Sequence, residues 1–226
     1  MADGDGADAS ESLPLFDHVL IVRPRSGAPR QNKQRPTTGY GFSAECNAVP
    51  LGIGEFMPAT GHYPIVFTDA DKPVPIALLG LEADENLFLE PDGRWLAGAH
   101  VPAYFQRELD PLDIGDATDH GARDATRSIA AFDADRERTE CFADALSREG
   151  LLVRRHVDIE LPGPRPYRLS GFLVIDIERL RNVPAAVMRD WRVRNWTDLI
   201  ALHIASMRNW EILLDLHALK STEEGA

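Results

Sequence analysis

The sequence has little of the residue types that mark secreted, membrane-spanning or nucleic-acid-binding proteins. It has two cysteines, and neither Cys46 nor Cys141 lies in a CxxC motif, so two buried free thiols in a reducing compartment are expected. No apolar run reaches about 18 residues, and no membrane span is predicted. The net charge of −12 argues against nucleic-acid or anionic-membrane binding. The acid-free basic stretch Arg23–Arg35 is either a solvated loop or a docking patch for an acidic partner.

Motifs for metal binding, nucleotide binding and acyl transfer are also missing. The seven histidines are too widely spread to form HExxH or HxH. The acidic segment DATDHGARD at 116–124 has the residue types to wrap a cation, but loops of this kind are usually solvated. The glycine pairs in GYGF and GIGEF match neither GxGxxG nor GxxxxGK[ST], and GxSxG does not occur. We therefore expect neither a cofactor nor a metal.

The chain reads as one α+β domain, with a β-rich N-terminal half that contains hairpins and a helical C-terminal unit. The acidic tail at 1–13 is predicted to be disordered. It lacks the basic and apolar regions of a signal peptide, so a cytoplasmic location is expected. The domain is expected over 14–219, with a β-rich part at about 14–109, a polar hinge at 110–127, an α/β and helical part at 128–219, and a tail at 220–226.

Apolar and β-branched segments bounded by turn residues predict the strands. YPIVFT and VPIALLGL are separated by the short turn DADKP. NLFLEPDGRWL has the clearest hairpin pattern, with Pro91 and Gly93 in its turn, and Asn86 is expected to cap a turn through its side chain. RRHVDIEL and RLSGFLVID predict a further strand pair, and HVLIV predicts a short strand near the start of the domain.

Helices are predicted mainly in the C-terminal half. DRERTECFADALSREGLL is typical of a helix that ends at Gly150, where positive φ is needed. Asp176 is expected to cap IERLRNV, and Pro184 to be the first residue of the helix PAAVMRDWRVR. Thr197 is expected to cap the last helix. One apolar face of that helix is predicted to hold Ile200, Ile204, Met207 and Leu214.

Two acidic residues lie in apolar segments marked by Gly and Pro: Glu55 in PLGIGEFMP and Glu85 in EADENLFLE. If buried, each needs a basic or backbone N–H partner. One interpretation is a salt-bridged or turn-capping acid. The other is the acid/base site of an enzyme, in which Arg107 orients an anionic group and Tyr63 and Trp95 form pocket walls.

Aromatic residues present a similar choice between packing and binding. Tyr63, Trp95 and Tyr104 fit either a core corner or the wall of a ligand pocket. Three tryptophans near arginines in the C-terminal helices fit either helix packing or an exposed surface for a protein partner. These are Trp191, Trp196 and Trp210.

In its order of segments the chain resembles the SapC-like family. The first half carries VPLGIGEF, YPIVF, PIALLGL, NLFLEPDGRW and VPAYFQR; the second carries TECFADALSREGLL, LSGFLVID followed by RL, and ALHIASMRNW. The likeness covers roughly Phe16 to Leu216. The chain departs from the family where members carry Tyr-Pro-Phe after the arginine-ended strand, since it reads FQRELDP here, and its central segment is short.

The resemblance implies a bacterial protein. The family is named from surface-layer biology, and its members tend to be encoded beside outer-membrane receptors and flavin-dependent halogenase-like enzymes. It transfers no catalytic residues. Our leading hypothesis is a non-enzymatic, cytoplasmic accessory protein that binds a protein partner or a small ligand in support of a surface, uptake or tailoring system. The alternatives are an enzyme with an acid/base site around Glu55, Glu85 and Arg107, and a ligand-sensing regulator. The sequence leaves the oligomeric state open.

Overall fold

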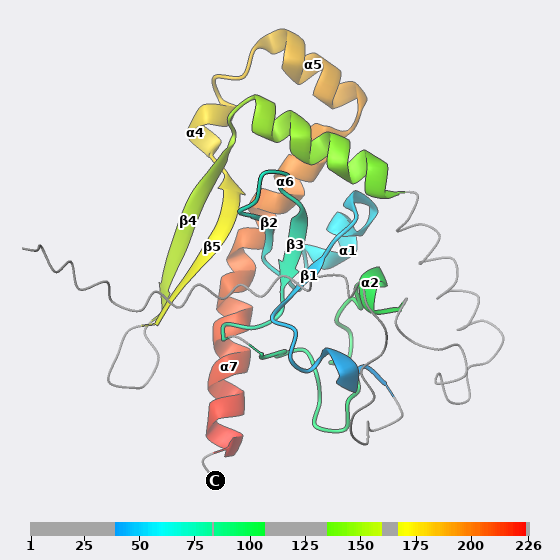
Figure 1. Cartoon of the computed structure of the whole chain (residues 1–226), viewed down its shortest axis with the longest axis vertical. Coiled ribbons are helices and arrows are strands. Elements are labelled where there is room, and N and C mark those ends of the chain that lie inside the picture. The colour runs from blue at the N-terminus through cyan, green and yellow to red at the C-terminus, as the bar shows by residue number, and fades with distance from the viewer. Residues whose placement is uncertain (1–38, 83, 107–134, 160–166, 225–226) are drawn as a thin grey trace, which may run out of the picture.

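A five-stranded antiparallel sheet forms the centre of the protein, with strand order β1-β3-β2-β5-β4 (Figure 1). The computed structural model describes residues 39–82, 84–106, 135–159 and 167–224. The strands are β1 (Ala48–Pro50), β2 (Ile65–Thr68), β3 (Pro75–Leu78), β4 (Leu152–Ile159) and β5 (Tyr167–Ile175). The α+β prediction is confirmed, but the two halves of the chain share the sheet. The predicted HVLIV strand and the hinge at 110–127 lie outside the described residues.

Strands β2 and β3 form the hairpin predicted from YPIVFT and VPIALLGL. Val66 lies opposite Ile76, and Ile65 lies opposite Ala77. All four residues of each strand are buried, as expected for central strands with near-continuous apolar sequence. Pro75 is the first residue of β3, where its missing N–H is tolerated. Strands β4 and β5 confirm the second predicted pair.

The NLFLEPDGRWL segment forms the predicted turn and a very short hairpin, in which the Glu90 N–H donates to the Arg94 carbonyl and the Leu96 N–H to the Phe88 carbonyl, both at 2.8 Å. The Gly93 N–H donates to the Glu90 carbonyl at 2.9 Å, and Gly93 has a φ of 82°, which suits glycine because it has no Cβ. Beyond the turn, Leu89 and Trp95 pair through a single isolated bridge. The ladder is interrupted because the Asn86 side chain accepts the Phe88 N–H at 3.0 Å, so that this group is not available to a partner strand.

Short helices fill the N-terminal half, and longer ones follow it. The short ones are η1 (Gly41–Ser43), η2 (Ile53–Glu55), α1 (Phe56–Ala59) and α2 (Ala103–Gln106). The helix at 135–148 confirms the prediction from DRERTECFADALSREGLL. At its end Gly150 has a φ of 65° and donates to the Ser147 carbonyl at 2.9 Å, as a glycine after a helix does.

The C-terminal unit consists of α4 (Ile177–Leu180), α5 (Ala185–Val193), α6 (Trp196–Ser206), η3 (Met207–Asn209) and α7 (Trp210–Glu224). Asp176 caps α4 as predicted, since its carboxylate accepts the N–H groups of Glu178 and Arg179 at 2.9 and 3.1 Å. Pro184 is the N-cap of α5 rather than its first residue. The expected tail begins inside α7, which continues to Glu224.

Thr197 was the wrong cap for α6, because the N-cap lies two residues earlier and Thr197 is already inside the helix. Its N-cap is Asn195, which has a φ of 58°. Asparagine tolerates this left-handed conformation better than most residues. It therefore allows α5 to turn into α6 without a longer loop, and it places Trp196 at the start of α6.

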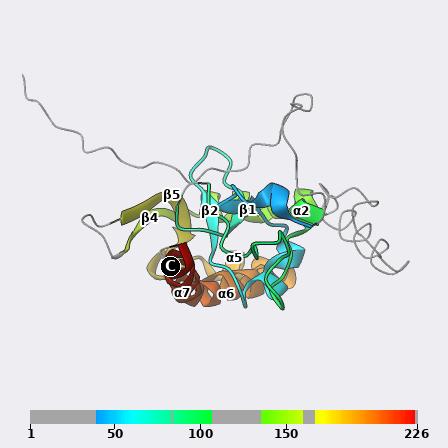
Figure 2. The same cartoon turned by 90° about the horizontal axis from the view of Figure 1, so that it is seen from below.

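The buried side of α6 and α7 differs from the predicted apolar face. Both helices lie on one face of the sheet (Figure 2). Ile200 is buried, whereas Leu214 is 36% exposed, so the predicted set is wrong in part. Several polar side chains are buried along these helices instead. They are His203, Ser206, Asn209 and His217.

Two of these side chains, those of Ser206 and His203, complete the sheet where its ladder stops. Strand β2 pairs with β5 only at Phe67 and Thr68. At Ile65, the N–H donates to Ser206 Oγ at 3.0 Å, and the carbonyl lies 2.7 Å from His203 Nδ1. His203 Nε2 accepts the Ile175 N–H at 3.1 Å. Nδ1 therefore carries the ring proton and donates to the Ile65 carbonyl. Burial lowers the pKa of His203 to about 4.

Candidate functional site

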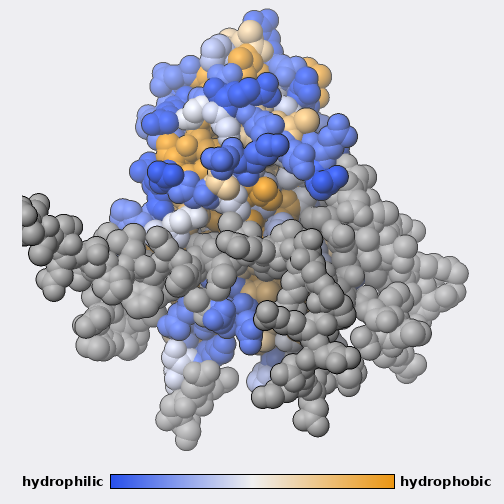
Figure 3. Space-filling model, in the orientation of Figure 1, coloured by the Kyte–Doolittle hydropathy of each residue, from blue (hydrophilic) through white to orange (hydrophobic). Residues whose placement is uncertain are grey.

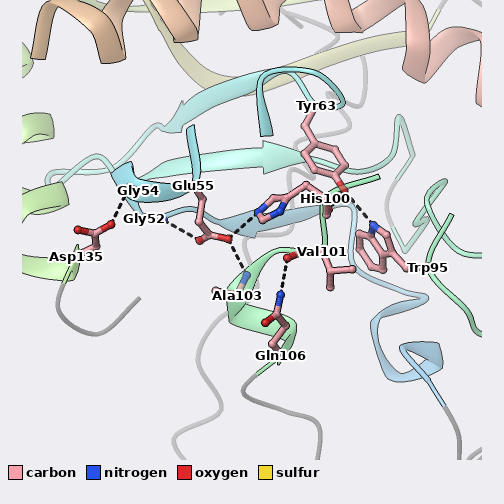
Figure 4. A network of polar contacts seen from close by, with 10 residues as sticks. All are labelled: Gly52, Gly54, Glu55, Tyr63, Trp95, His100, Val101, Ala103, Gln106 and Asp135. Atoms are coloured by element: carbon pink, nitrogen blue, oxygen red, sulfur yellow. Dashed lines mark hydrogen bonds and ion pairs between the residues drawn. The ribbon is translucent and has the colours of Figure 1, made fainter. Parts of the chain in front are cut away.

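Glu55 links two segments of the N-terminal half (Figure 4). One of its oxygens accepts the Ala103 N–H at 2.8 Å and lies 3.0 Å from His100 Nε2; the other accepts the Gly52 N–H at 3.3 Å. The Glu55 side chain is 13% exposed. Since Ala103 is the first residue of α2, this carboxylate anchors the start of α2 to the η2 turn. A carboxylate with three such contacts is suited to holding structure together.

The GIGE turn has three consecutive backbone N–H groups, a geometry that can bind anions. Each of the three groups has an acceptor from this chain. The pairs are Gly52 with Glu55 Oε2 at 3.3 Å, Ile53 with Thr139 Oγ1 at 3.0 Å, and Gly54 with Asp135 Oδ2 at 2.8 Å. The turn therefore joins the helix at 135–148 to the N-terminal half and does not offer an open phosphate cradle.

Tyr63 and Trp95 lie in the core, side by side (Figure 4). The Tyr63 hydroxyl accepts the Trp95 Nε1–H at 3.1 Å and donates to the His100 carbonyl. Burial raises the pKa of this hydroxyl. Tyr63 is 0% exposed and Trp95 8%. Tyr104 is half-buried, with its ring edge-on to Phe105 at 6.1 Å. These contacts favour the packing interpretation of the three aromatic residues.

Glu85 belongs to a second network, which connects the loop before Asn86 to α7. Its carboxylate accepts the N–H groups of Leu81 and Glu82 at 3.3 and 3.4 Å. It also lies 3.3 Å from His217 Nδ1 and 3.7 Å from Lys220 Nζ. Like Glu55, it is a largely buried acid with several polar contacts, and these contacts hold a loop against a helix.

The acid/base hypothesis requires Glu55, Glu85 and Arg107 to converge. The contacts of Glu55 and Glu85 that the structure describes have no residue in common. Arg107 lies outside the described residues. The structure thus accounts for each acid separately as a structural contact.

Two of the three C-terminal tryptophans line a cleft of 320 Å³ between the helix at 135–148 and the corner where α5 meets α6. Trp191 and Trp196 are 3% and 9% exposed, and their rings meet edge-on at 6.3 Å. An exposed tryptophan surface is therefore wrong for this pair, which forms a buried wall instead. Trp210 is half-buried, and its ring lies 5.6 Å from Phe172.

Four charged side chains line the same cleft. Asp190 and Arg194 form an ion pair at 2.9 Å, and the Arg194 guanidinium lies 5.1 Å from the centre of the Trp196 ring. Arg148 and Glu149, at the end of the helix at 135–148, form no ion pair with a residue that the structure describes. Figure 3 shows hydrophobic patches among hydrophilic surface at this end of the molecule. The cleft thus combines two tryptophan rings with one positive side chain, Arg148, and one negative side chain, Glu149, that form no ion pair with a described residue.

The two cysteines are free thiols, so a disulfide is absent as expected, but the predicted burial is wrong for Cys141. Cys141 is exposed and lines the cleft, whereas Cys46 is half-buried. Among the described residues, no group of three or more His, Cys, Asp or Glu is placed to hold a metal ion. No helix in the described ranges is long and apolar enough to cross a membrane. The segments 116–124 and 23–35 lie outside those ranges.

Sequence reasoning missed several residues that the structure brings together. His100 contacts Glu55 across 45 positions, and no local pattern marks that pairing. Arg148 and Glu149 look like the polar end of any surface helix, and only the neighbouring α5–α6 corner makes them part of a cleft. The break between α5 and α6 at Asn195 was the available signal for a corner.

Fold and site together define an α+β protein with a helix-lined cleft, in which Glu55 and Glu85 each make several contacts within the chain. The SapC family model matches residues 30–123 and 112–213, so the chain belongs to the SapC family. Searches of the curated proteins and of the solved structures give no significant match.

Proposed function

We propose that this SapC family member is a non-enzymatic accessory protein that acts by binding, through the cleft between the helix at 135–148 and the α5–α6 corner. The proposal rests on a contrast between two sets of charged side chains, those with several contacts inside the protein and those at the cleft that form no ion pair with a described residue. Glu55 and Glu85 are engaged in structural contacts, whereas Arg148 and Glu149 lie at a concave surface without an ion-pair partner among the described residues.

A binding role fits the composition of the cleft. Tryptophan and arginine are the residue types most enriched at energetically important contacts, and here both come from neighbouring helices. The occupant is a protein partner or a small ligand. In the cell we place this activity in the cytoplasm, in support of a bacterial surface, uptake or tailoring system.

Native mass spectrometry of the protein purified gently from its own host tests the proposal. The wild type should retain a second protein or a small molecule, and the double variant Arg148→Gln/Arg194→Gln should lose it. The matched control is Arg136→Gln, on the same helix, where the arginine lies 3.9 Å from Glu140 and does not line the cleft. A wild type that carries nothing, or a complex that survives in the double variant, would contradict the proposal.

Ligand sensing and enzymatic activity remain alternatives with distinct signatures. A regulator would change its partner complex on ligand addition. An enzyme that uses Glu55 would lose turnover in Glu55→Gln, whereas a structural Glu55 predicts a loss of stability alone.

A further inference from the structure

We infer that the cleft binds a free α-amino acid with an apolar side chain. This inference rests on the proposed function and names the class of ligand for the same site. Three features of the described residues support it: the balance of charge in the cleft, the polarity of the helix ends that meet there, and its size.

The charge balance favours a zwitterion. The Asp190–Arg194 ion pair neutralises one charge of each sign. Arg148 and Glu149 then leave one positive and one negative group for a ligand. A ligand with only a carboxylate would pair with Arg148 but be repelled by Glu149. A ligand with only an ammonium group would pair with Glu149 but be repelled by Arg148. A molecule with both an ammonium and a carboxylate pairs with each.

The helix ends at the cleft have matching polarity. The helix at 135–148 ends here, and the C-terminal end of a helix carries partial negative charge that favours a cation. The eleven-residue α6 begins here at Trp196, and its N-cap Asn195 makes no side-chain cap hydrogen bond. The N-terminal end of a helix favours an anion. The two helix dipoles therefore favour the ammonium beside the helix at 135–148 and the carboxylate beside the start of α6, where Asp198 lies in the first turn.

Size and rigidity limit the ligand further. A cleft of 320 Å³ is at the lower end of the usual range of about 300–1,000 Å³ for small-molecule sites, which suits one amino acid better than a nucleotide. The small exposed parts of the Trp191 and Trp196 rings, which are 3% and 9% exposed, and of Ala145 form the apolar part of the cleft wall. The end of the helix is held by Arg179, whose Nη1 donates to the Gly150 carbonyl at 2.7 Å, which lowers the ordering cost of binding.

Tryptophan fluorescence and calorimetry of the full chain with phenylalanine as the probe test this inference. We expect saturable binding, and binding at least about 10-fold weaker for 3-phenylpropanoate and for phenethylamine, because each lacks one of the two charge-assisted contacts. Arg148→Gln and Glu149→Gln should each weaken phenylalanine binding by about 10-fold or more. Arg136→Gln should bind like the wild type.

No response to phenylalanine, leucine, valine or methionine at about 10 mM would overturn the inference, since that concentration exceeds the dissociation constants of even weak specific complexes. If 3-phenylpropanoate or phenethylamine bound as tightly as phenylalanine, the inference would be overturned as well. If the double variant nevertheless loses a protein partner in the native experiment, the proposed function stands and only the ligand class fails. If neither phenylalanine nor a partner depends on the cleft, both fail.

Discussion

The Glu55 network and the C-terminal cleft both place acidic groups beside bases and aromatic rings. Around Glu55 every described contact joins parts of the same chain: the start of α2, the η2 turn and His100. In the cleft, Asp190 of α5 is paired with Arg194, the C-cap of that helix, whereas Arg148 and Glu149 form no ion pair in the described part of the chain. Burial with many polar contacts therefore identifies the scaffold, and unpaired charge at a concave surface identifies the candidate site.

The largest expected effect concerns the scaffold. His203→Leu would leave the Ile65 carbonyl and the Ile175 N–H without their buried partners. Each orphaned group costs about 1–3 kcal/mol, so we expect a loss of about 4 kcal/mol in the free energy of unfolding. Urea denaturation measures this loss. His156→Leu, at an exposed histidine of β4, is the control and should change stability little; comparable losses in both variants would remove His203 from its proposed role.

Acid should destabilise the protein through the same histidine. The pKa of His203 is about 4 in the folded state, against about 6.5 when unfolded. The unfolded chain therefore binds the proton more tightly. The stability that the neutral ring contributes is fully present above pH 6.5 and is lost as the pH falls from 6.5 through 4. That loss amounts to about 3 kcal/mol.

Urea midpoints measured from pH 7.5 to 4 would show this dependence. In His203→Gln, which cannot titrate, the slope in this window should flatten. An unchanged slope in that variant would mean that other groups cause the acid sensitivity.

A smaller effect is expected at Glu55. Glu55→Gln keeps the shape of the side chain but weakens the contacts with Ala103, Gly52 and His100. We expect a loss of about 1–2 kcal/mol, the range for a hydrogen-bonded charge at a partly buried site. Thermal unfolding of Glu55→Gln, compared with that of the control Glu90→Gln, measures the difference in stability. The Glu90 side chain pairs with the exposed Arg94. If Glu55→Gln kept full stability but lost an enzymatic activity of the wild type, the enzyme alternative would be favoured instead.

The smallest effect on stability is expected in the cleft. Arg148 and Glu149 are exposed and form no ion pair with a described residue, and the Arg148 side chain makes an exposed hydrogen bond to the Asp144 carbonyl at 3.3 Å. Arg148→Gln and Glu149→Gln should therefore leave the urea midpoint nearly unchanged while they weaken binding. A clear loss of stability in either variant would show that these charges support the scaffold, and it would remove the contrast between the two regions.

Local sequence chemistry predicted much of the fold. The apolar pattern predicted β2 and β3, Asp176 was identified as a cap, and Gly150 was identified at a helix end. The matched segments of the SapC family also gave the family correctly. Each of these features depends on residues within a few positions of one another, or on the order of such segments along the chain.

The candidate site was less predictable, because its residues come together only through long-range packing. Trp191 and Trp196 were predicted to bind a partner, but neither their burial nor their place in a cleft with Arg148 and Glu149 was predicted. The prediction of the apolar face of the last helices was also wrong in part, since His203 is buried against Ile65, a strand residue 138 positions away. A periodic pattern assumes that a buried face is apolar, and it cannot recognise a histidine whose two ring nitrogens complete a sheet.

The sequence by itself determined the family, the positions of most strands and helices, and the turn and cap residues, because these follow from short-range sterics and hydrogen bonding. The tertiary structure decided which charges are satisfied. Glu55 meets His100 and Glu85 meets His217, whereas Arg148 and Glu149 form no ion pair with a described residue, and the Arg148 guanidinium donates to the Asp144 carbonyl of its own helix. Whether a charge is structural or available for binding depends on which distant segments pack against it, and that is a property of the folded chain.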